Sequence, residues 1–161
     1  YIYSAVLYVT GGAMEIIIKR FRELTAKELY EILRARAQVF IIEQSCLYQD
    51  VDGKDYHAHH LFMLDDDRVV GYLRILDRGI SYDEVSIGRV MVDSQYRGNG
   101  LAGNLMKSAI DFIEHSMNER KIRISAQSYL TDFYKNLGFK IESEEYLEDL
   151  IPHIEMLYCK K

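Results

Sequence analysis

The sequence predicts a mixed α/β (α+β) fold, in which a twisted, mostly antiparallel sheet is flanked by helices. Apolar, β-branched runs bounded by turn residues recur along the chain, as strands do. Two long segments instead carry apolar residues at helical spacing. One of these segments separates the strand-like runs 85–92 and 121–126, which predicts a single parallel crossover in an otherwise antiparallel sheet.

The length and composition predict one domain. The chain has 161 residues, of which 48% are apolar and 28% charged, as is usual for a globular domain. No stretch approaches the roughly 20 consecutive apolar residues that span a membrane. Residues 1–13 carry no charge and precede Met14, so we expect them to be an added leader or appended segment. The domain proper is then 14–161.

The first half of the chain predicts a strand, a helix and a long loop. Residues 14–21 are apolar and β-branched, which favours a strand. Thr25 and Glu28 form a capping box that starts a helix, and helical spacing of apolar residues continues to Phe40. The segment from Gln44 to Ala58 is polar and rich in turn residues, so we expect a loop.

The middle of the chain predicts antiparallel strands. The runs 60–64 and 69–76 are separated by Asp65-Asp66-Asp67-Arg68, which is typical of a hairpin. A further strand is expected at 85–92. A glycine-rich loop at 98–103 then leads into a helix whose apolar face reaches Ile113.

The last third predicts a strand, a short helix and two closing strands. Charged and apolar residues alternate over 121–126, as in a strand with one buried face. Leu130 to Leu137 predicts a short helix, which Gly138 ends as a C-cap. The closing strands are expected at 139–143 and 154–158, around an acidic loop, ESEEYLED.

Charge and cysteine content restrict the function classes. The net charge is −5 and no basic stripe is visible, which argues against a general nucleic-acid binder and favours a cationic substrate. Cys46 and Cys159 have no metal-site or disulfide-framework spacing. Whether they are paired cannot be deduced from the sequence. Two thiols in an acidic globular chain suit a reducing cytoplasm, so we expect a cytoplasmic protein. We expect no membrane partner. A homodimer is one possible assembly.

The segment VMVDSQYRGNGLAGNLM predicts an anion site. A strand stops, a glycine-rich turn follows and a helix begins. Glycines allow close backbone approach, and the helix start presents unpaired N–H groups with a positive dipole end. Arg97 adds a cation. This combination suits a pyrophosphate, although an ordinary strand–turn–helix corner would use glycines as well.

Two interpretations of this loop compete. Gly98-Asn99-Gly100-Leu101-Ala102-Gly103 matches the dinucleotide fingerprint G-x-G-x-x-G, which would indicate an NAD-dependent oxidoreductase. That fingerprint belongs to the first strand–helix unit of a parallel sheet and needs an acidic residue after the next strand. Here antiparallel strands come first, and the next strand ends at Gln127.

The other interpretation is carried by Arg97-x-x-Gly100-x-Ala102, which resembles the R/Q-x-x-G-x-G/A signature of the GNAT (GCN5-related) N-acetyltransferase superfamily. The preceding Gly88-Arg89-Val90-Met91-Val92-Asp93 is similar to the family's strand before that loop. The family's later F-Y-x-x-x-G-F is matched by the segment from Phe133 to Phe139. One helix and one strand separate the two motifs, as in the family, and the resemblance covers roughly 15–158.

A narrower resemblance is to the ElaA-like branch of that superfamily. It is carried by Arg36-x-x-Val39-Phe40-x-x-Glu43-Gln44, Asp50-x-Asp52-Gly53-x-Asp55, His60-Leu61, Ala126-Gln127-x-Tyr129-Leu130 and the tail from Tyr146 to His153. Leu150 departs from the pattern, which has glycine there. The resemblance supplies no acceptor substrate.

The resemblance implies the GNAT acyl-CoA N-acyltransferase fold and transfer of an acetyl group from acetyl-CoA to a primary amine by direct attack. Backbone groups of Val90, Met91 and Val92 would pair with the pantetheine arm. An exposed N–H there can stabilise the oxyanion of the tetrahedral intermediate. The other implied cofactor-binding residues are Arg97, Gly98, Asn99, Gly100, Leu101, Ala102, Gly103 and Gln127.

The resemblance also implies that Tyr134 is the general acid that protonates the departing thiolate. Without the motif, Tyr134 would be taken for a core aromatic residue, since the chain has 13 tyrosines. The amine must lose a proton, and a carboxylate or a water held by one usually takes it. The candidates on the substrate side are Glu43, Asp149 and His153, and more widely Glu84, Asp93 and Glu148.

The histidines and aspartates between Asp50 and His60 also invite a metal hypothesis, which the spacing does not support. His59 and His60 would point to opposite faces of a strand. D-x-D-G-x-D has its glycine at the fourth position, and Leu61 stands where a calcium loop needs glutamate. We therefore expect that this loop holds no metal and that its residues form turns or contact the substrate.

The alternative to an enzyme is a non-catalytic acyl-CoA-binding or sensor domain.

Overall fold

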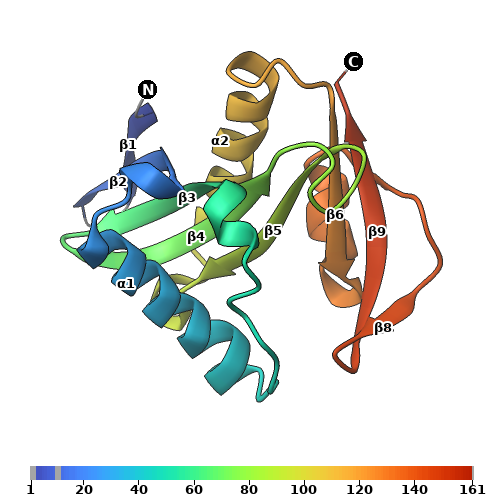
Figure 1. Ribbon diagram of the computed structural model, residues 1–161, viewed down its shortest axis with the longest axis horizontal. Coiled ribbons are helices and arrows are strands. Elements are labelled where there is room, and N and C mark those ends of the chain that lie inside the picture. The colour runs from blue at the N-terminus through green and yellow to red at the C-terminus, as the bar shows by residue number, and fades with distance from the viewer. Residues whose placement is uncertain (1–2, 10–11, 161) are drawn as a thin grey trace.

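The computed structural model describes residues 3–9 and 12–160, and it places helices against both faces of one twisted sheet (Figure 1). The strands are β1 (Tyr3–Val9), β2 (Gly12–Arg20), β3 (Ala58–Asp65), β4 (Arg68–Leu76), β5 (Val85–Val92), β6 (Lys121–Gln127), β7 (Phe139–Ile141), β8 (Tyr146–Glu148) and β9 (Ile151–Cys159). The helices are α1 (Ala26–Arg36), α2 (Leu101–His115) and α3 (Thr131–Asn136). Short helical turns are η1 (Phe21–Glu23), η2 (Ala37–Glu43), η3 (Lys54–His57), η4 (Ser94–Tyr96) and η5 (Ser128–Leu130).

The strand order is β1-β2-β3-β4-β5-β6-β9-β7, with β8 added to β9. Only the β5–β6 pair is parallel among the described strands, and the crossover between them runs through α2. The predicted α/β (α+β) architecture with one parallel connection is therefore confirmed. Part of the predicted leader, residues 3–9, is β1, which pairs antiparallel with β2.

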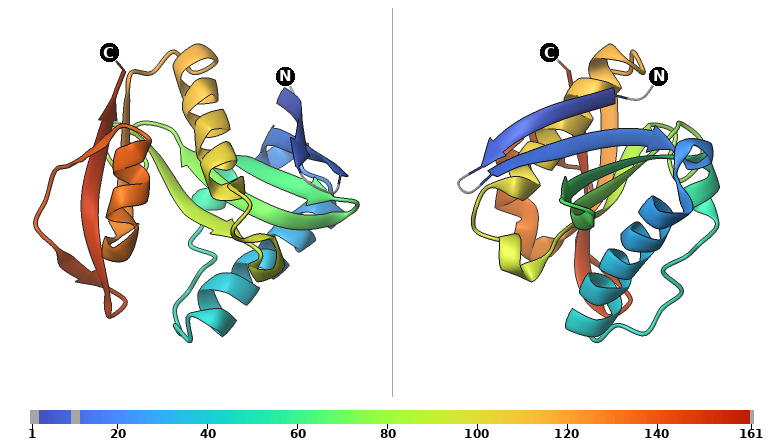
Figure 2. Two further views of the ribbon diagram at one scale, coloured as in Figure 1. Left: turned by 180° about the vertical axis from the view of Figure 1, so that it is seen from behind. Right: turned by 90° about the vertical axis from the view of Figure 1, so that its left-hand side faces the viewer.

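Two apolar layers hold the helices to the sheet. The larger layer lies under α2 and α3 and contains Leu105, Phe112 and Tyr134 together with alternate residues of the strands. The smaller layer lies under α1 and contains Ile32, Phe62 and Tyr72. The views in Figure 2 show α2 and α3 on the face of the sheet opposite α1. Both faces of the central strands are thus covered, which explains their long apolar runs.

The local signals for the helices are confirmed, with two adjustments to the expected elements. Thr25 Oγ1 accepts the Glu28 N–H and the Glu28 carboxylate accepts the Thr25 N–H, which completes the capping box. The helix predicted to reach Phe40 changes at Arg36 into the wider π-helical η2. The predicted acidic loop contains a short strand, β8, because its backbone pairs with β9.

Candidate active site

The edge of β5 is the first element of the site. β5 pairs with β6 only at Val85–Ile122 and Ser86–Arg123, and the two strands then diverge (Figure 1). On the β6 side, the rest of β5 has no ladder partner among the described strands. Peptide groups along this edge can therefore hydrogen-bond an extended ligand, as a missing strand would.

A β-bulge shapes this edge. Tyr72 pairs with Met91 and Arg74 with Gly88, so two residues of β5, Arg89 and Val90, lie opposite one residue of β4. Arg89 adopts a left-handed φ of 55°, which costs energy for a residue other than glycine. Val90, in the bulge, packs on the α2 layer, and Met91, the next residue, packs on the α1 layer.

The glycine loop forms the second element. Gly98 and Gly100 have φ of 82° and 75°, and Gly100 is the N-cap of α2. A Cβ added to either glycine would meet no atom within 4 Å, so backbone conformation rather than crowding requires glycine here. The first amides of α2 are open to an anion in front of them. A loop of this kind suits an anion such as a pyrophosphate.

Arg97 connects this loop to its neighbours. Its Nε donates to the carbonyl oxygen of Val92, 3.0 Å away. Its Nη2 lies 2.6 Å from Oε2 of Glu43, at the end of η2. The structure thus brings together a residue predicted for the cofactor and a residue predicted for the substrate side.

Residues 43–46, which we call the strap, reach both sides of the divergence between β5 and β6. Glu43 contacts Arg97 beside α2, as described. Gln44 accepts a hydrogen bond from Nε2 of Gln127 at the end of β6, at 3.4 Å. Cys46 Sγ lies 3.6 Å from the carbonyl oxygen of Asp149, in the β8–β9 turn. Gln127 and Asp149, both predicted for the site, are therefore held to the strap.

A buried ion network joins the end of α1 to the loop that follows the strap. Arg36 is fully buried and pairs with Asp50 at 2.9 Å and Asp55 at 2.8 Å. Arg74 pairs with Asp55 at 3.0 Å and Asp52 at 2.7 Å. A removed partner would leave an unpaired buried charge, which is strongly destabilising.

Arg89 joins this network from the bulge of β5. Its Nε lies 2.7 Å from Oδ1 of Asp50, and its guanidinium lies over the Tyr48 ring at 5.4 Å. Burial alone would raise the pKa of Asp52, but the hydrogen bonds and charges of Arg74, the Lys54 N–H and Arg89 together outweigh it and lower the pKa to about 2. These contacts anchor β5 to the network within the part of the strand that is free of β6.

Four of the residues considered for a metal, Asp50, Asp52, Asp55 and His60, belong to this network. His60 is buried, and burial lowers its pKa, so the ring is neutral at pH 7. Its Nε2 donates to the Asp55 carbonyl at 2.9 Å, so Nδ1 accepts from the Tyr72 hydroxyl at 2.9 Å. Within the ranges that the structure describes, no group of three or more His, Cys, Asp or Glu residues could hold a metal ion.

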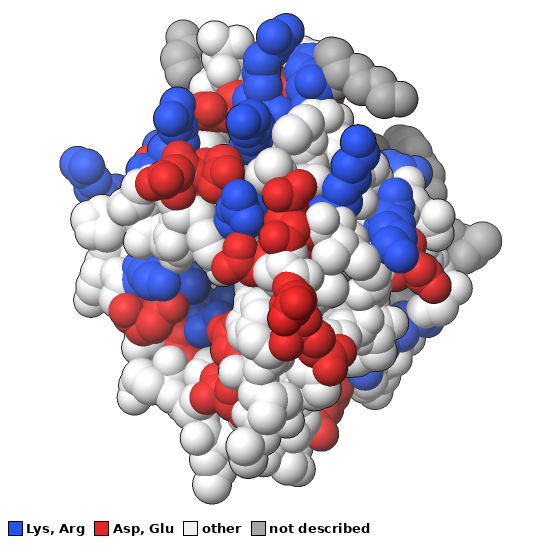
Figure 3. All heavy atoms as spheres, turned by 90° about the vertical axis from the view of Figure 1, so that its right-hand side faces the viewer, with Lys and Arg blue, Asp and Glu red and all other residues white. Residues whose placement is uncertain are grey.

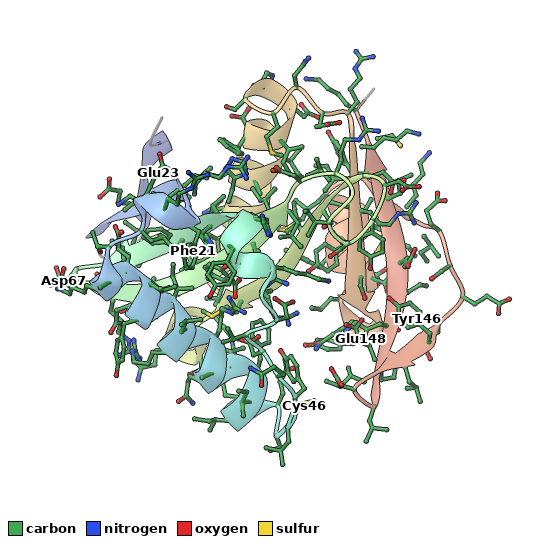
Figure 4. All side chains as sticks on the ribbon, in the orientation of Figure 1. Phe21, Glu23, Cys46, Asp67, Tyr146 and Glu148 are labelled. Carbon is green, nitrogen blue, oxygen red and sulfur yellow. The ribbon has the colours of Figure 1, made fainter. Side chains whose placement is uncertain are left out.

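The wall that the strap contacts comes from β6, β8 and β9. Ser125 Oγ lies 2.6 Å from the Tyr146 hydroxyl and 2.9 Å from Oε2 of Glu148. Figure 4 shows Tyr146 and Glu148 on β8, with Cys46 on the loop beyond α1. The ring of His153 stacks on Tyr146 with 6.2 Å between centroids.

Charges on this wall are partly compensated. Arg123 lies 2.9 Å from both Glu84 and Glu155. The face of the molecule that carries β8 and β9 shows patches of acidic side chains (Figure 3). Asp93 is engaged elsewhere, as the cap of η4 and the partner of Arg68 at 2.8 Å. Such a wall favours a cationic ligand.

Two further sequence-predicted residues are placed by the structure. Tyr134, in α3, is 6% exposed and makes edge contacts with Phe133 and Phe139. Burial raises its pKa to about 12, so its hydroxyl is protonated at pH 7. Leu150, at the position where glycine was expected, has φ of 65° and is 89% exposed. A leucine there costs about 1–2 kcal/mol relative to glycine.

Sequence reasoning did not identify Arg89, Ser125 or Tyr146 as site residues. The available signal for the network was Arg36, an arginine on the apolar stripe of a predicted helix, which requires a buried carboxylate. The signal for Ser125 was its place on the polar face of the alternating strand 121–126.

The divergent β5 edge followed by a glycine loop and a helix start defines the class of protein, an acyltransferase of the GNAT type. The chain belongs to the GNAT family, whose "Acetyltransferase (GNAT) domain" sequence model matches residues 23–159. It is similar to protein ElaA of Escherichia coli, with 38% identity over 136 residues, covering 83% of this chain and 89% of ElaA. A UPF0039 protein of Schizosaccharomyces pombe is 38% identical over 145 residues, which cover 89% of this chain and 95% of the relative.

Solved structures agree with this assignment. An acyl-CoA N-acyltransferase from Pseudomonas aeruginosa is 40% identical, with a TM-score of 0.87 over 91% of this chain and 99% of that protein. The structure of E. coli ElaA gives 35% identity and a TM-score of 0.85 over 90% of this chain and 99% of that protein. The GNAT fold and the ElaA-like assignment are therefore confirmed. Among the described helices, none has the length and apolar character needed to cross a bilayer.

Proposed function

We propose that this protein is an N-acetyltransferase that moves the acetyl group of acetyl-CoA directly onto a primary amine. The observation that carries the proposal is the β5 edge, which is free of β6 and leads straight into the glycine loop. In CoA an extended arm is joined to a pyrophosphate, and this order matches that of the free β5 edge and the glycine loop. The membership of the GNAT family supports the same donor class.

On the donor side, each role falls to groups of this chain. Peptide groups of Val90, Met91 and Val92 hold the arm, and an N–H of this edge stabilises the oxyanion as the amine attacks. The amides from Gly98 to Gly103 hold the pyrophosphate. Tyr134, protonated at pH 7, gives its proton to the departing thiolate.

The acceptor side is proposed to take a cation. The net charge of −5 and the carboxylates around Arg123 favour an ammonium group over an anion. Glu43, the first candidate base, is paired with Arg97, and His153 binds the Ile151 carbonyl through Nδ1 at 2.8 Å. The cytoplasmic location and a homodimer stay predictions.

Two measurements test the proposal. Calorimetric titration with acetyl-CoA and with NAD tests the donor, and we expect binding and a higher melting temperature with acetyl-CoA only. A panel of amines, followed by release of CoA thiol, tests turnover. A larger thermal shift with NAD would overturn the donor assignment. Binding of acetyl-CoA without release of CoA by any amine would instead support the non-catalytic sensor domain.

A further inference from the structure

Three side chains on the wall formed by β6, β8 and β9 make a hydrogen-bond chain with a fixed direction. A carboxylate can only accept, so Ser125 Oγ donates its single proton to Oε2 of Glu148 at 2.9 Å. The 2.6 Å contact between Ser125 Oγ and the Tyr146 hydroxyl must then be donated by Tyr146. The chain therefore runs from the Tyr146 O–H through the Ser125 O–H to the Glu148 carboxylate.

This chain lies beside the unpaired edge of β5. Ser125 is two residues beyond Arg123, the last residue of β6 that pairs with β5. Ile124 and Ala126 are buried in the α2 layer, so strand alternation places Ser125 on the other face, together with Gln127. Gln127 contacts the strap through Gln44. The chain thus lies on the face of the sheet that the strap covers.

Glu148 differs from the other candidate bases in its pairing. Glu43 is held by Arg97, Glu84 by Arg123 and Asp93 by Arg68. Glu148 has no cationic partner in the part of the chain that the structure describes, and its carboxylate accepts the hydrogen bond from Ser125.

We propose that Tyr146, Ser125 and Glu148 form the relay that takes the proton from the acceptor amine, an inference that rests on the proposed function. Before attack, one N–H bond of the substrate's ammonium group breaks and its proton goes to the Tyr146 oxygen, which leaves a lone pair on the nitrogen. The Tyr146 proton moves to Ser125 Oγ, and the Ser125 proton moves to Oε2 of Glu148. The nitrogen loses one positive charge and the carboxylate loses its negative charge. The second N–H proton, lost once the nitrogen has bonded to the acetyl carbon, replaces the proton that Tyr134 gives to the thiolate.

The state of Tyr146 suits this role. Burial, together with Glu148 and Glu155, raises its pKa. The phenol is therefore neutral at pH 7, so it passes a proton on rather than acting as a phenolate base. Its oxygen keeps lone pairs that can accept an N–H. The stacked ring of His153 holds the phenol in place.

The test begins with the best amine of the panel and measures CoA release by wild type and by Tyr146→Phe, Ser125→Ala and Glu148→Gln. Each variant breaks the relay at a different atom, and we expect kcat/KM for the amine to fall by about 100-fold, as is usual for lost base assistance. The dissociation constant for acetyl-CoA, measured by calorimetry, should not change. Glu145→Gln is the matched control, since it removes one exposed carboxylate from the same segment, and it should keep wild-type activity.

Two readouts separate a relay from a structural role. The Tyr146→Phe/Glu148→Gln double variant should lose no more than the worse single variant, because either change already breaks the chain. An aminooxy analogue of the amine is neutral at pH 7 and needs no deprotonation before attack, so its rate should fall far less in the variants. An equal loss with both acceptors would mean general damage and would overturn the relay.

The failure of the relay and the failure of the proposed function give different results. Wild-type turnover with amines together with full activity of all three variants overturns the relay alone. Absence of amine-dependent CoA release from wild type overturns the proposed function and the relay with it.

Discussion

The guanidinium of Arg97 lies 2.6 Å from the carboxylate of Glu43, although 54 residues separate them in the chain. The pair joins the end of η2 to the loop before α2, where CoA phosphates are proposed to bind. Arg97 is 49% exposed and Glu43 25% exposed at the side chain, so water screens their attraction. A phosphate that approaches Arg97 has to compete with Glu43.

Replacing Glu43 by glutamine should therefore strengthen acetyl-CoA binding. The change removes a negative charge beside an anion site and frees Arg97. Because the pair is partly exposed, we expect a gain of about 2–5-fold in affinity at low salt, which shrinks as salt is added. Calorimetric titration at two salt concentrations measures this effect. Glu31→Gln, which breaks the Glu31–Arg34 pair on α1, is the control, and an equal gain there would remove the local explanation.

The glycine loop offers a matched comparison. Gly100 and Gly53 have φ of 75° and 79°, and a Cβ at either would meet no atom within 4 Å. Gly100→Ala and Gly53→Ala should thus cost similar backbone strain, about 1 kcal/mol of unfolding free energy. Only Gly100→Ala should weaken acetyl-CoA binding. We expect the affinity to fall by about tenfold or more, because the added methyl group keeps the pyrophosphate from approaching the backbone closely. Gly100→Val should abolish it.

Chemical denaturation checks the stability half of this comparison, and calorimetry checks the affinity half. Equal loss of affinity in both alanine variants would show that strain alone is responsible. Unchanged affinity in Gly100→Ala would place the pyrophosphate elsewhere.

The buried His59 predicts that the free energy of unfolding falls at acidic pH. Burial, with a contribution from Arg20, lowers its pKa from 6.5 to about 4. The unfolded chain therefore binds more protons than the folded one between these values, so stability should fall as the pH drops from 6.5 towards 4. In His59→Gln, the dependence of the urea midpoint on pH in this window should become flatter.

The control for this prediction is His115→Gln, at the exposed end of α2, where the side chain is 62% exposed. That variant should keep the wild-type dependence on pH. If the urea midpoint of His59→Gln depended on pH as in wild type, other groups would cause the loss of stability at acidic pH.

Much of the fold followed from local patterns. The alternation in 121–126 and the helix before it predicted the parallel β5–β6 pair, and the Thr25–Glu28 box predicted the start of α1. β8 could not be predicted, because an acidic segment acquires its strand conformation only from pairing with β9. The bulge at Arg89 is likewise set by a tertiary contact, the ion pair with Asp50.

The candidate site also has one part that could be predicted from the sequence and one part that could not. The glycine loop is contiguous in the chain, so its motif could be recognised in the sequence. The Tyr146–Ser125–Glu148 chain joins β6 to β8 through their common neighbour β9, and no local spacing encodes such a contact. Arg97 and Glu43 were assigned to opposite sides of the reaction, and only the three-dimensional structure places them together.

Tyr134→Phe tests the proposed acid. Phenylalanine keeps the ring and its edge contacts with Phe133 and Phe139, and only the proton donor is lost. Loss of general acid assistance is typically worth about 10²–10⁴ in rate, so kcat should fall at least about tenfold while the Kd for acetyl-CoA changes little.

The defect in Tyr134→Phe should shrink when the acetyl donor has a more acidic thiol, since a better leaving group needs less protonation. Tyr129→Phe, which removes the hydroxyl of a neighbouring tyrosine that is 75% exposed, should leave kcat unchanged. If Tyr134 were only a packing residue, phenylalanine would keep its ring contacts and each folded molecule would stay active. Wild-type turnover in folded Tyr134→Phe would therefore remove this residue from the chemical step and leave water as the proton source.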